Sequence, residues 1–486
     1  MEGKMMNIKI EEFGTMKKVF MFSLIAISVV LTSCEIPGDL NDNPNEITLA
    51  DVDSRLFLNG AQLANTLAQC GHLNRISGMY CGQLTGFTSL YSNIYGYSLS
   101  TVESNGSWRR VYTGVVTNVR HVVETAPDDK LLVGIAKVVE AHAVGTMAIL
   151  MGDVPYSEIG GEVDDPKFDS QVSVLNALSS LLDDGISALQ SASSREEVYD
   201  IYFNGDKDDW IAAAYTLKAR YALIQKDYST ALSAANSGIS SSAGDMLHIP
   251  RGDASSLEGD KNLFNIILAG SRTGDIGTGD SYLMQLLNDT TDVYRGNDKT
   301  DETARFGYYK IDESSFSSNL GVIEQFEPQP MVTYFENQLI KAEAAARTSG
   351  FDDGLSNLND YREWLTGGGR LNATFDDSSQ YKYEAYVEAD FESGGMENSD
   401  GVSKDDALLR EIIEERYVSG FGTFMPFNDH RRLRGAGETD LIPPFQLNTA
   451  AATNHVERIP YAQDELTSNE NAPEDPGLYA ATEVNE

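Results

Sequence analysis

Two distant segments of this chain can be superposed without gaps. Each has small residues on a first helix, an aromatic residue at a turn, and mostly small residues on a second helix. The first set is Ala219, Ala222, Tyr228, Ala231 and Ala235, and the second, at identical spacings, is Ala342, Ala345, Phe351, Gly354 and Leu358. Small residues let two antiparallel helices pack closely, so the repeat predicts tetratricopeptide-like helical hairpins. Alanine-rich amphipathic helices without a repeat are the alternative.

Helical periodicity extends well beyond these two segments. Apolar residues recur three and four apart, the spacing of one helix face, in residues 131–151, 210–226, 335–347 and 405–418. Few stretches alternate with a period of two, so we predict a mainly α fold of helical hairpins with long irregular insertions. The insertions are rich in Gly, Ser and Asp and span 237–259, 270–280, 288–303 and 366–399. Such excursions usually carry a binding surface or are mobile.

The N-terminal region has the pattern of an export signal. An uncharged run of 13 residues, 19–31, follows Lys17 and Lys18 and ends in small residues before Cys34. The run is too short to span a bilayer, which needs about 20 apolar residues. It resembles a bacterial lipoprotein signal, so we predict that residues 1–33 are removed, that Cys34 is acylated, and that translation starts at Met16. A plain secretory signal with an accidental cysteine is the alternative.

The charge of the chain excludes several classes of partner. There are 74 Asp and Glu against 36 Lys and Arg, which gives a formal net charge of −38, and 41% of the residues are hydrophobic. A field of this sign repels phosphate backbones and anionic lipid, so we predict no nucleic-acid binding and no electrostatic membrane docking. Membrane attachment would rest on the acyl chains. Residues 34–50 are polar and turn-rich, as in a flexible tether, and we predict one helical domain over 51–486.

The cysteine and histidine pattern predicts no metal site. Apart from Cys34 the chain has only Cys70 and Cys81, which would either form a disulfide or lie buried as thiols. The six histidines are scattered, without an HExxH motif or a Cys/His cluster. We therefore expect neither a transition metal nor a cofactor.

Seven short motifs lie, in this order, at 42–45, 108–118, 152–158, 199–220, 336–346, 412–432 and 458–469; the third reads Gly-Asp-Val-Pro-Tyr-Ser-Glu. In residues and order they resemble the SusD/RagB family of nutrient-binding outer-membrane lipoproteins, and the resemblance covers essentially the whole mature chain. The segment 421–426 departs from the family pattern. We expect most motif residues to be structural. Gly152 and Pro155 would form a helix-to-loop corner, and Arg416, Arg431 and Arg432 would tie helices together through carboxylates.

The resemblance implies a SusD-like α/α superhelix on the surface of a Bacteroidetes-like Gram-negative outer membrane. It implies capture of a glycan, or less often a peptide, and transfer to a SusC-like TonB-dependent β-barrel transporter. It implies no catalysis. A surface lipoprotein glycoside hydrolase and a pure interaction scaffold are the alternatives, but neither GxSxG nor HExxH occurs, and acidic pairs such as Asp183-Asp184 are expected as solvated helix faces.

The segment 78–112 holds the densest set of groups suited to sugar binding. Sugars need flat aromatic faces together with amide, carboxylate and guanidinium groups. The candidates are Tyr80, Tyr91, Asn93, Tyr95, Tyr97, Trp108 and Arg109, set among glycines as in an exposed, adaptable loop. Trp108 would equally well pack on Tyr112, four residues on. We expect alanine at Tyr91, Tyr95 and Tyr97 to abolish binding without changing the melting temperature; otherwise the site lies in the insertions after Gly270 or Thr366.

Overall fold

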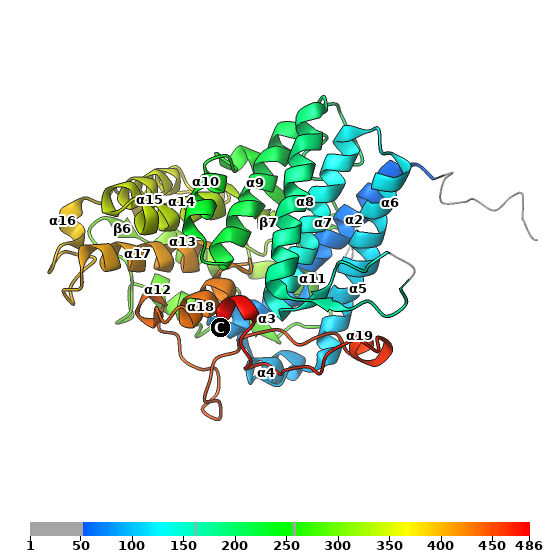
Figure 1. Cartoon of the computed structure of the whole chain (residues 1–486). Helices are drawn as coiled ribbons and strands as arrows, with labels where there is room; N and C mark the ends of the chain where they lie inside the picture. Colours follow the sequence, from blue (N-terminus) through cyan, green and yellow to red (C-terminus); the bar gives the residue numbers. More distant parts are fainter. Residues whose placement is uncertain (1–51, 161–162, 256–258) are drawn as a thin grey trace, which may run out of the picture. The chain divides into compact units, whose positions relative to one another are not determined.

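Antiparallel helices dominate the computed structural model, which describes residues 52–160, 163–255 and 259–486 (Figure 1). The longer helices are α2 (Ser54–Gln69), α3 (His72–Tyr80), α6 (Thr117–Thr125), α7 (Lys130–Met151), α8 (Gln171–Ser191), α9 (Lys207–Ile224), α10 (Tyr228–Ala235), α14 (Tyr334–Thr348), α15 (Phe351–Thr366), α17 (Lys404–Ser419) and α18 (Met425–Gly435). The shorter ones are α4 (Ser89–Tyr95), α5 (Asn105–Arg109), α11 (Leu263–Ala269), α12 (Tyr282–Leu287), α13 (Thr303–Tyr309), α16 (Glu388–Phe391) and α19 (Gln463–Ser468). The prediction of a mainly α fold is confirmed, and the four predicted helices coincide with α7, α9, α14 and α17.

The two superposable segments form the predicted hairpins. Helices α9 and α10 pack together, as do α14 and α15, and α10 packs on α14. In the first hairpin Ala219, Ala222 and Ala231 are buried in one cluster. In the second, a Cβ placed on Gly354 of α15 would lie 2.6 Å from the Ala346 Cβ of α14, so only glycine allows this approach. The small-residue pattern therefore reports real helix-to-helix contacts.

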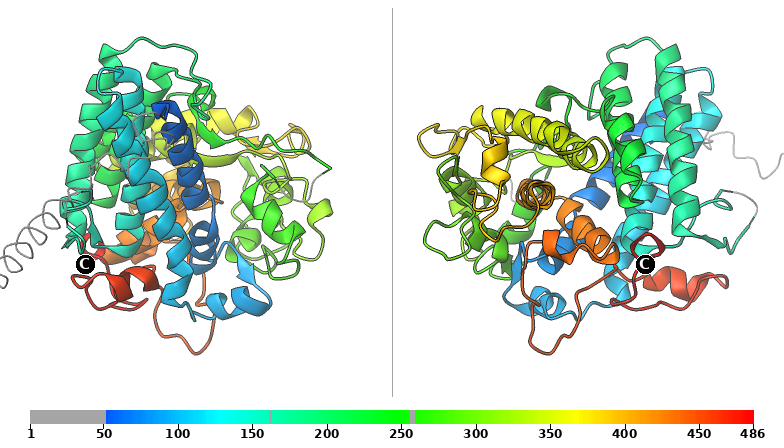
Figure 2. Two further views of the ribbon diagram at one scale, coloured as in Figure 1. Left: turned by 90° about the vertical axis from the view of Figure 1, so that its right-hand side faces the viewer. Right: turned by 60° about the vertical axis from the view of Figure 1, so that its left-hand side comes forward.

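A further hairpin, α7–α8, has no counterpart in the superposed segments. Its helices approach at two glycines: a Cβ on Gly134 would lie 2.5 Å from the Leu189 side chain and 3.0 Å from the Gly185 carbonyl oxygen. Helix α7 is long and apolar enough to cross a membrane, but 94% of its apolar window is buried inside the unit Ser54–Glu486. It is a core helix, and the hairpins α7–α8, α9–α10 and α14–α15 stand side by side (Figures 1 and 2).

A buried ion-pair cluster ties α14 to α17 and α18. Glu343 of α14 is fully buried and accepts hydrogen bonds from both terminal nitrogens of Arg432, at 2.8 and 2.9 Å. Arg416 of α17 donates two hydrogen bonds to Asp429 and lies 3.5 Å from Glu343. Arg416 and Arg432 thus join helices through carboxylates, as expected. Arg431 differs, because it donates to backbone carbonyls and to the Asn428 side chain.

The insertions are joined by short antiparallel strand pairs. Strand β1 (Thr85–Gly86) pairs with β5 (Ile276–Gly277), β2 (Val154–Pro155) with β3 (Phe168–Asp169), β4 (Met246–His248) with β7 (Gln329–Val332), and β6 (Thr300–Asp301) with β8 (Lys382–Tyr383). The helix-to-loop corner after α7 has the expected form: Gly152 takes a φ of +90° and Pro155 lies in β2. Except for β2–β3, these short pairs join segments that are far apart in the sequence.

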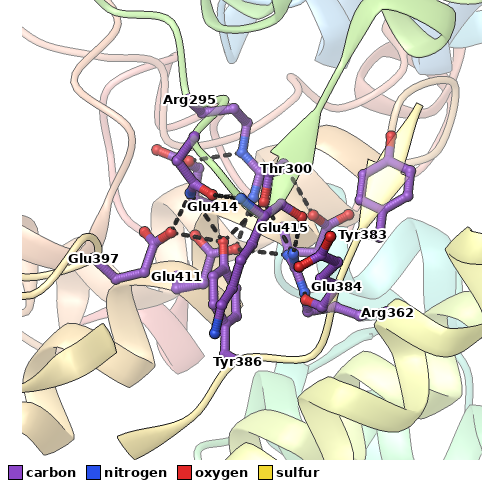
Figure 3. Close-up of polar contacts among 12 residues, drawn as sticks. Arg295, Thr300, Arg362, Tyr383, Glu384, Tyr386, Glu397, Glu411, Glu414 and Glu415 are labelled. Carbon is purple, nitrogen blue, oxygen red and sulfur yellow. Dashed lines mark hydrogen bonds and ion pairs between the residues drawn. The ribbon is translucent and has the colours of Figure 1, made fainter. Parts of the chain in front are cut away.

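A second buried ion-pair cluster fixes the insertions 288–303 and 366–399 against α17. Arg295 contacts Glu411, Glu414 and Glu415 of α17 at 2.8–2.9 Å (Figure 3). It also contacts the buried Glu302 at 2.6 Å. Arg362 of α15 donates to the Glu384 carbonyl and the Thr300 hydroxyl on the same side of the cluster. These parts of the insertions are anchored, in contrast to the mobility that their composition suggested.

Candidate functional site

Most of the aromatic candidates in 78–112 lie inside the protein. The exposed fractions are 2% for Tyr80 and Tyr91, 8% for Tyr97 and 7% for Trp108. The segment forms helices α3, α4 and α5 in place of the expected exposed loop. The reason is that α4 turns one face, with Tyr91 and Ile94, into the main core.

The buried tyrosines hold the surrounding chain in place. The Tyr91 hydroxyl accepts a hydrogen bond from the Arg75 Nε at 2.9 Å. The Tyr80 and Tyr97 rings meet edge to face at 5.6 Å, and the Tyr97 hydroxyl accepts from the Asn448 backbone N–H at 3.0 Å. A side chain held in this way is not free to stack on a sugar. Tyr80, Tyr91 and Tyr97 therefore have structural roles in this conformation.

Trp108 and Arg109 lie apart from α4. The Trp108 ring packs 4.6 Å from Tyr112 and 6.1 Å from Phe168, as the packing alternative anticipated. Arg109 is exposed and pairs with Asp464 of α19 at 3.2 Å. The seven candidates are thus not brought together in one site.

Asn93 and Tyr95 remain accessible on α4, but two positions apart on a helix they face different directions, and β5 brings the 270–280 insertion beside Tyr95 alone. Asn93 is exposed and Tyr95 half-buried. Tyr95 packs on the backbone of β1, since a Cβ on Gly86 would lie 2.9 Å from its Cβ. The Thr85 hydroxyl donates to the Gly279 carbonyl at 2.7 Å, and the Phe87 ring lies against Gly279. We call Thr85, Phe87, Tyr95 and Asp280 the α4–β5 surface.

The electrostatics of this surface suit a neutral polar ligand. Burial raises the pKa of Tyr95, the contact with the Thr85 side chain lowers it, and the nearby Asp280 carboxylate raises it further. The phenol therefore stays protonated and able to donate at neutral pH. Together Tyr95 and Asp280 offer an aromatic ring and a carboxylate from two segments that are far apart in sequence. The sequence alone indicated Tyr95 but not its neighbour Asp280, because nothing in it signals the β1–β5 pairing.

Tyr91 and Tyr95 differ in burial, so their replacement should lower stability by different amounts. We predict that Tyr91→Ala lowers the free energy of unfolding by about 3–5 kcal/mol, as for other large buried side chains. Tyr95→Ala should cost only about 1–2 kcal/mol, because its side chain is half-buried. Denaturant unfolding of the two variants measures the difference. Equal losses would show that Tyr95 is as deeply packed as Tyr91. An alanine triple variant at Tyr91, Tyr95 and Tyr97 is therefore not expected to keep its melting temperature.

The remaining titratable groups of interest have structural explanations. Cys70 and Cys81 are both free thiols and buried. Burial raises the pKa of Cys70 to about 12, so it is not a reactive thiolate at neutral pH. In the described ranges, no group of three or more His, Cys, Asp or Glu side chains is placed to hold a metal ion.

Raised carboxyl pKa values also occur, which is a common sign of an acid catalyst. Burial raises the pKa of Glu411 well above its usual range, and Glu397 and Glu414 add to this while Arg295 opposes it. Glu411 is only 5% exposed and hydrogen-bonded to Arg295 (Figure 3). The perturbed carboxyl thus belongs to the ion-pair cluster that anchors the insertions.

The fold defines a helical-repeat protein in which paired hairpins carry long anchored insertions. The model of a SusD-like family described as "Starch-binding associating with outer membrane" matches residues 44–423. The chain therefore belongs to the SusD-like family, as the seven motifs indicated. A search of curated proteins gave no match.

Solved structures share the fold at low sequence identity. A SusD/RagB family protein of Bacteroides thetaiotaomicron is 19% identical, with a TM-score of 0.64 over 86% of this chain and 95% of that chain. A chitin-binding SusD homologue of Flavobacterium johnsoniae is 16% identical, with a TM-score of 0.65 over 88% and 98%. A SusD homologue of Parabacteroides distasonis is also 16% identical, with a TM-score of 0.65 over 89% and 97%. These likenesses establish the superhelical fold.

The predictions made for the N-terminus lie outside the described residues. They comprise the signal peptide 1–33, the acylated Cys34, the tether 34–50 and the first family motif at 42–45. They remain predictions from the sequence.

Proposed function

We propose that this protein captures a glycan at the surface of the outer membrane. The single observation that carries the proposal is membership of a family described as starch-binding and associated with the outer membrane. A solved structure with the same fold is named as a chitin-binding SusD homologue, which supports glycan as the ligand class. The lipoprotein signal with Cys34 would anchor the body, residues 51–486, through the tether 34–50. The captured glycan would pass to a SusC-like TonB-dependent barrel.

The α4–β5 surface is the proposed glycan site. The apolar C–H face of a sugar ring packs on the Tyr95 ring, and Phe87 extends the apolar area. The Asp280 carboxylate accepts hydrogen bonds from sugar hydroxyls, and the Tyr95 hydroxyl can donate one. Asp280 is exposed, so it binds sugar without first breaking contacts inside the protein. The β1–β5 pairing and the Thr85–Gly279 hydrogen bond hold the two halves of the site together before the ligand arrives.

The proposal contains no catalytic step. Glu411, whose pKa burial raises well above its usual range, is buried against Arg295 and not on the α4–β5 surface. A glycan incubated with the protein should keep its chain length. Shortening of the chain would favour the hydrolase alternative.

Binding should depend on Tyr95. We expect Tyr95→Ala to weaken glycan affinity at least about tenfold, which corresponds to about 1.4 kcal/mol. The measurement is calorimetric titration of the mature chain with a panel of starch-derived and chitin-derived oligosaccharides and of peptides. Tyr199→Ala is the matched control, because Tyr199 is also half-buried but packs beside α2, under Arg55.

Three outcomes would contradict this account in different ways. Unchanged affinity in Tyr95→Ala would place the site elsewhere. Binding of peptides alone would place the protein among peptide-binding members of the family. Tight association with a barrel partner but no affinity for any glycan or peptide would favour the scaffold alternative.

A further inference from the structure

A polar groove lies between the two predicted hairpins, at the end of α10 and along α14 and α15. Its volume is about 460 Å³, within the range of about 300–1,000 Å³ typical of small-molecule sites. We call it the hairpin groove. Its side-chain lining includes Asn236, Tyr334, Gln338, Lys341, Asp360, Glu363 and Trp364. It shares no residue with the α4–β5 surface.

Two aromatic rings form one wall of the hairpin groove. Tyr334 and Trp364 meet edge to face, with ring centroids 5.4 Å apart and an interplanar angle of 71°. Tyr361 supports Trp364 from behind at 5.4 Å. Tyr361 is fully buried, whereas Tyr334 and Trp364 are half-buried. The aromatic wall is therefore fixed by packing and still has ring surface facing the groove.

The frame of the hairpin groove is held by buried amides. The Asn337 Nδ2 donates to the carbonyls of Ala235 and Ile239, at 2.9 and 3.1 Å, which fixes the end of α10 to α14. The Gln338 Nε2 donates to the Asn357 carbonyl at 2.9 Å, which fixes α14 to α15. Because these contacts are made within the protein itself, the groove is shaped in advance and little order has to be gained on binding.

The charged side chains on the rim favour a neutral ligand rich in hydroxyls. Asp360 and Glu363 are exposed, and Lys341 is half-buried. Within the described ranges, none of these three side chains forms a salt bridge. Two carboxylates against one ammonium, on a chain of net charge −38, disfavour an anionic ligand. Hydroxyl groups can donate to the carboxylates and accept from Lys341.

We propose that the hairpin groove is a second carbohydrate site, which takes one end of a short neutral oligosaccharide against Tyr334 and Trp364. The proposal rests on the proposed glycan function and adds to it. A polysaccharide held at both the α4–β5 surface and the hairpin groove would be retained more tightly than by either site, because the second contact is intramolecular.

Trp364 gives the hairpin groove its own spectroscopic signal. The chain has three tryptophans, and the other two, Trp108 and Trp210, are 7% and 0% exposed. We expect a starch-derived or chitin-derived tetrasaccharide to change the tryptophan emission of the wild type and of Tyr95→Ala. The change should be lost in Trp364→Phe, which keeps an aromatic ring for packing.

Lys341→Met should weaken the fluorescence-detected affinity at least about threefold. Lys130→Met and Glu196→Gln, at exposed positions outside the groove, are the controls and should leave this affinity unchanged.

The test separates this proposal from the proposed function. Calorimetry could detect tetrasaccharide binding that needs Tyr95, while the tryptophan emission stays constant and Trp364→Ala keeps the binding stoichiometry of the wild type. That result would refute the second site and leave the glycan function standing. If no saccharide binds the wild type by either method, both are refuted. An emission change produced only by uronic-acid oligosaccharides would refute the neutral ligand class. Thermal unfolding of each variant checks that the fold is intact.

Discussion

Glu343→Ala is expected to lower the free energy of unfolding by about 3–5 kcal/mol, because removing one partner of a buried ion pair leaves uncompensated charge. Glu343 is fully buried among Arg347, Arg416 and Arg432. Burial alone would raise its pKa, but the three guanidinium groups hold it at about 2. The measurement is denaturant unfolding at neutral pH.

The pH dependence gives this first prediction a sign. The pKa of Glu343 is depressed in the folded state, so its stabilising contribution is present above about pH 4.5 and is lost as the pH falls toward 2. The stability difference between wild type and Glu343→Ala should therefore shrink over that range. Asp184→Ala is the control, since its pair with Lys137 lies at the surface and is worth at most about 1 kcal/mol. A similar loss of unfolding free energy in both variants would show that the buried Glu343 contributes no more to stability than a surface ion pair.

Arg295→Met is expected to cost a similar amount, about 3–5 kcal/mol, for the same physical reason. One guanidinium contacts Glu411, Glu414 and Glu415 (Figure 3). It also contacts Glu302, and the Arg295 side chain is only 2% exposed. Methionine keeps much of the volume but removes this cation from the carboxylates of Glu302, Glu414 and Glu415. The loss should appear as a lower unfolding midpoint, together with faster proteolysis in the insertions 288–303 and 366–399 that this cluster anchors.

Glu411→Gln is the matched control within the same cluster. Burial raises the pKa of Glu411, so its ionised form is disfavoured in the folded state. The neutral amide should therefore cost no more than about 1 kcal/mol. Because a raised folded-state pKa makes the native state lose stability as the pH rises, Glu411→Gln should gain on the wild type at higher pH. A large loss in Glu411→Gln, or none in Arg295→Met, would contradict this description of the cluster.

Sequence periodicity predicted the hairpins but not every helix pair. The spacing from Ala342 to Leu358 repeats that from Ala219 to Ala235, and both sets report the same close approach of helices. The α7–α8 pair was not predicted from the sequence, because its closest approach uses Gly134 and Gly185, which fall at different positions along their helices. Residue spacing therefore predicts a helix-to-helix contact only where the chain repeats that spacing.

The candidate site was only partly predictable for a related reason. Tyr91 and Tyr95 both stand in an aromatic, glycine-rich stretch, and composition does not tell them apart. Their burial differs because α4 has only seven residues, about two turns, and Tyr91 lies on its inner side with Ile94, while Tyr95 is its last residue and packs on β1. Asp280 joins Tyr95 only through β1–β5, a pair two residues long that gives no sequence signal.

The most direct test of the glycan-capture account is a crystal structure of the mature chain with an oligosaccharide that calorimetry shows to bind. We predict a sugar ring packed on Tyr95, with hydroxyls within hydrogen-bonding distance of Asp280. An oligosaccharide bound at saturating concentration elsewhere on the protein, with the α4–β5 surface empty, would contradict it.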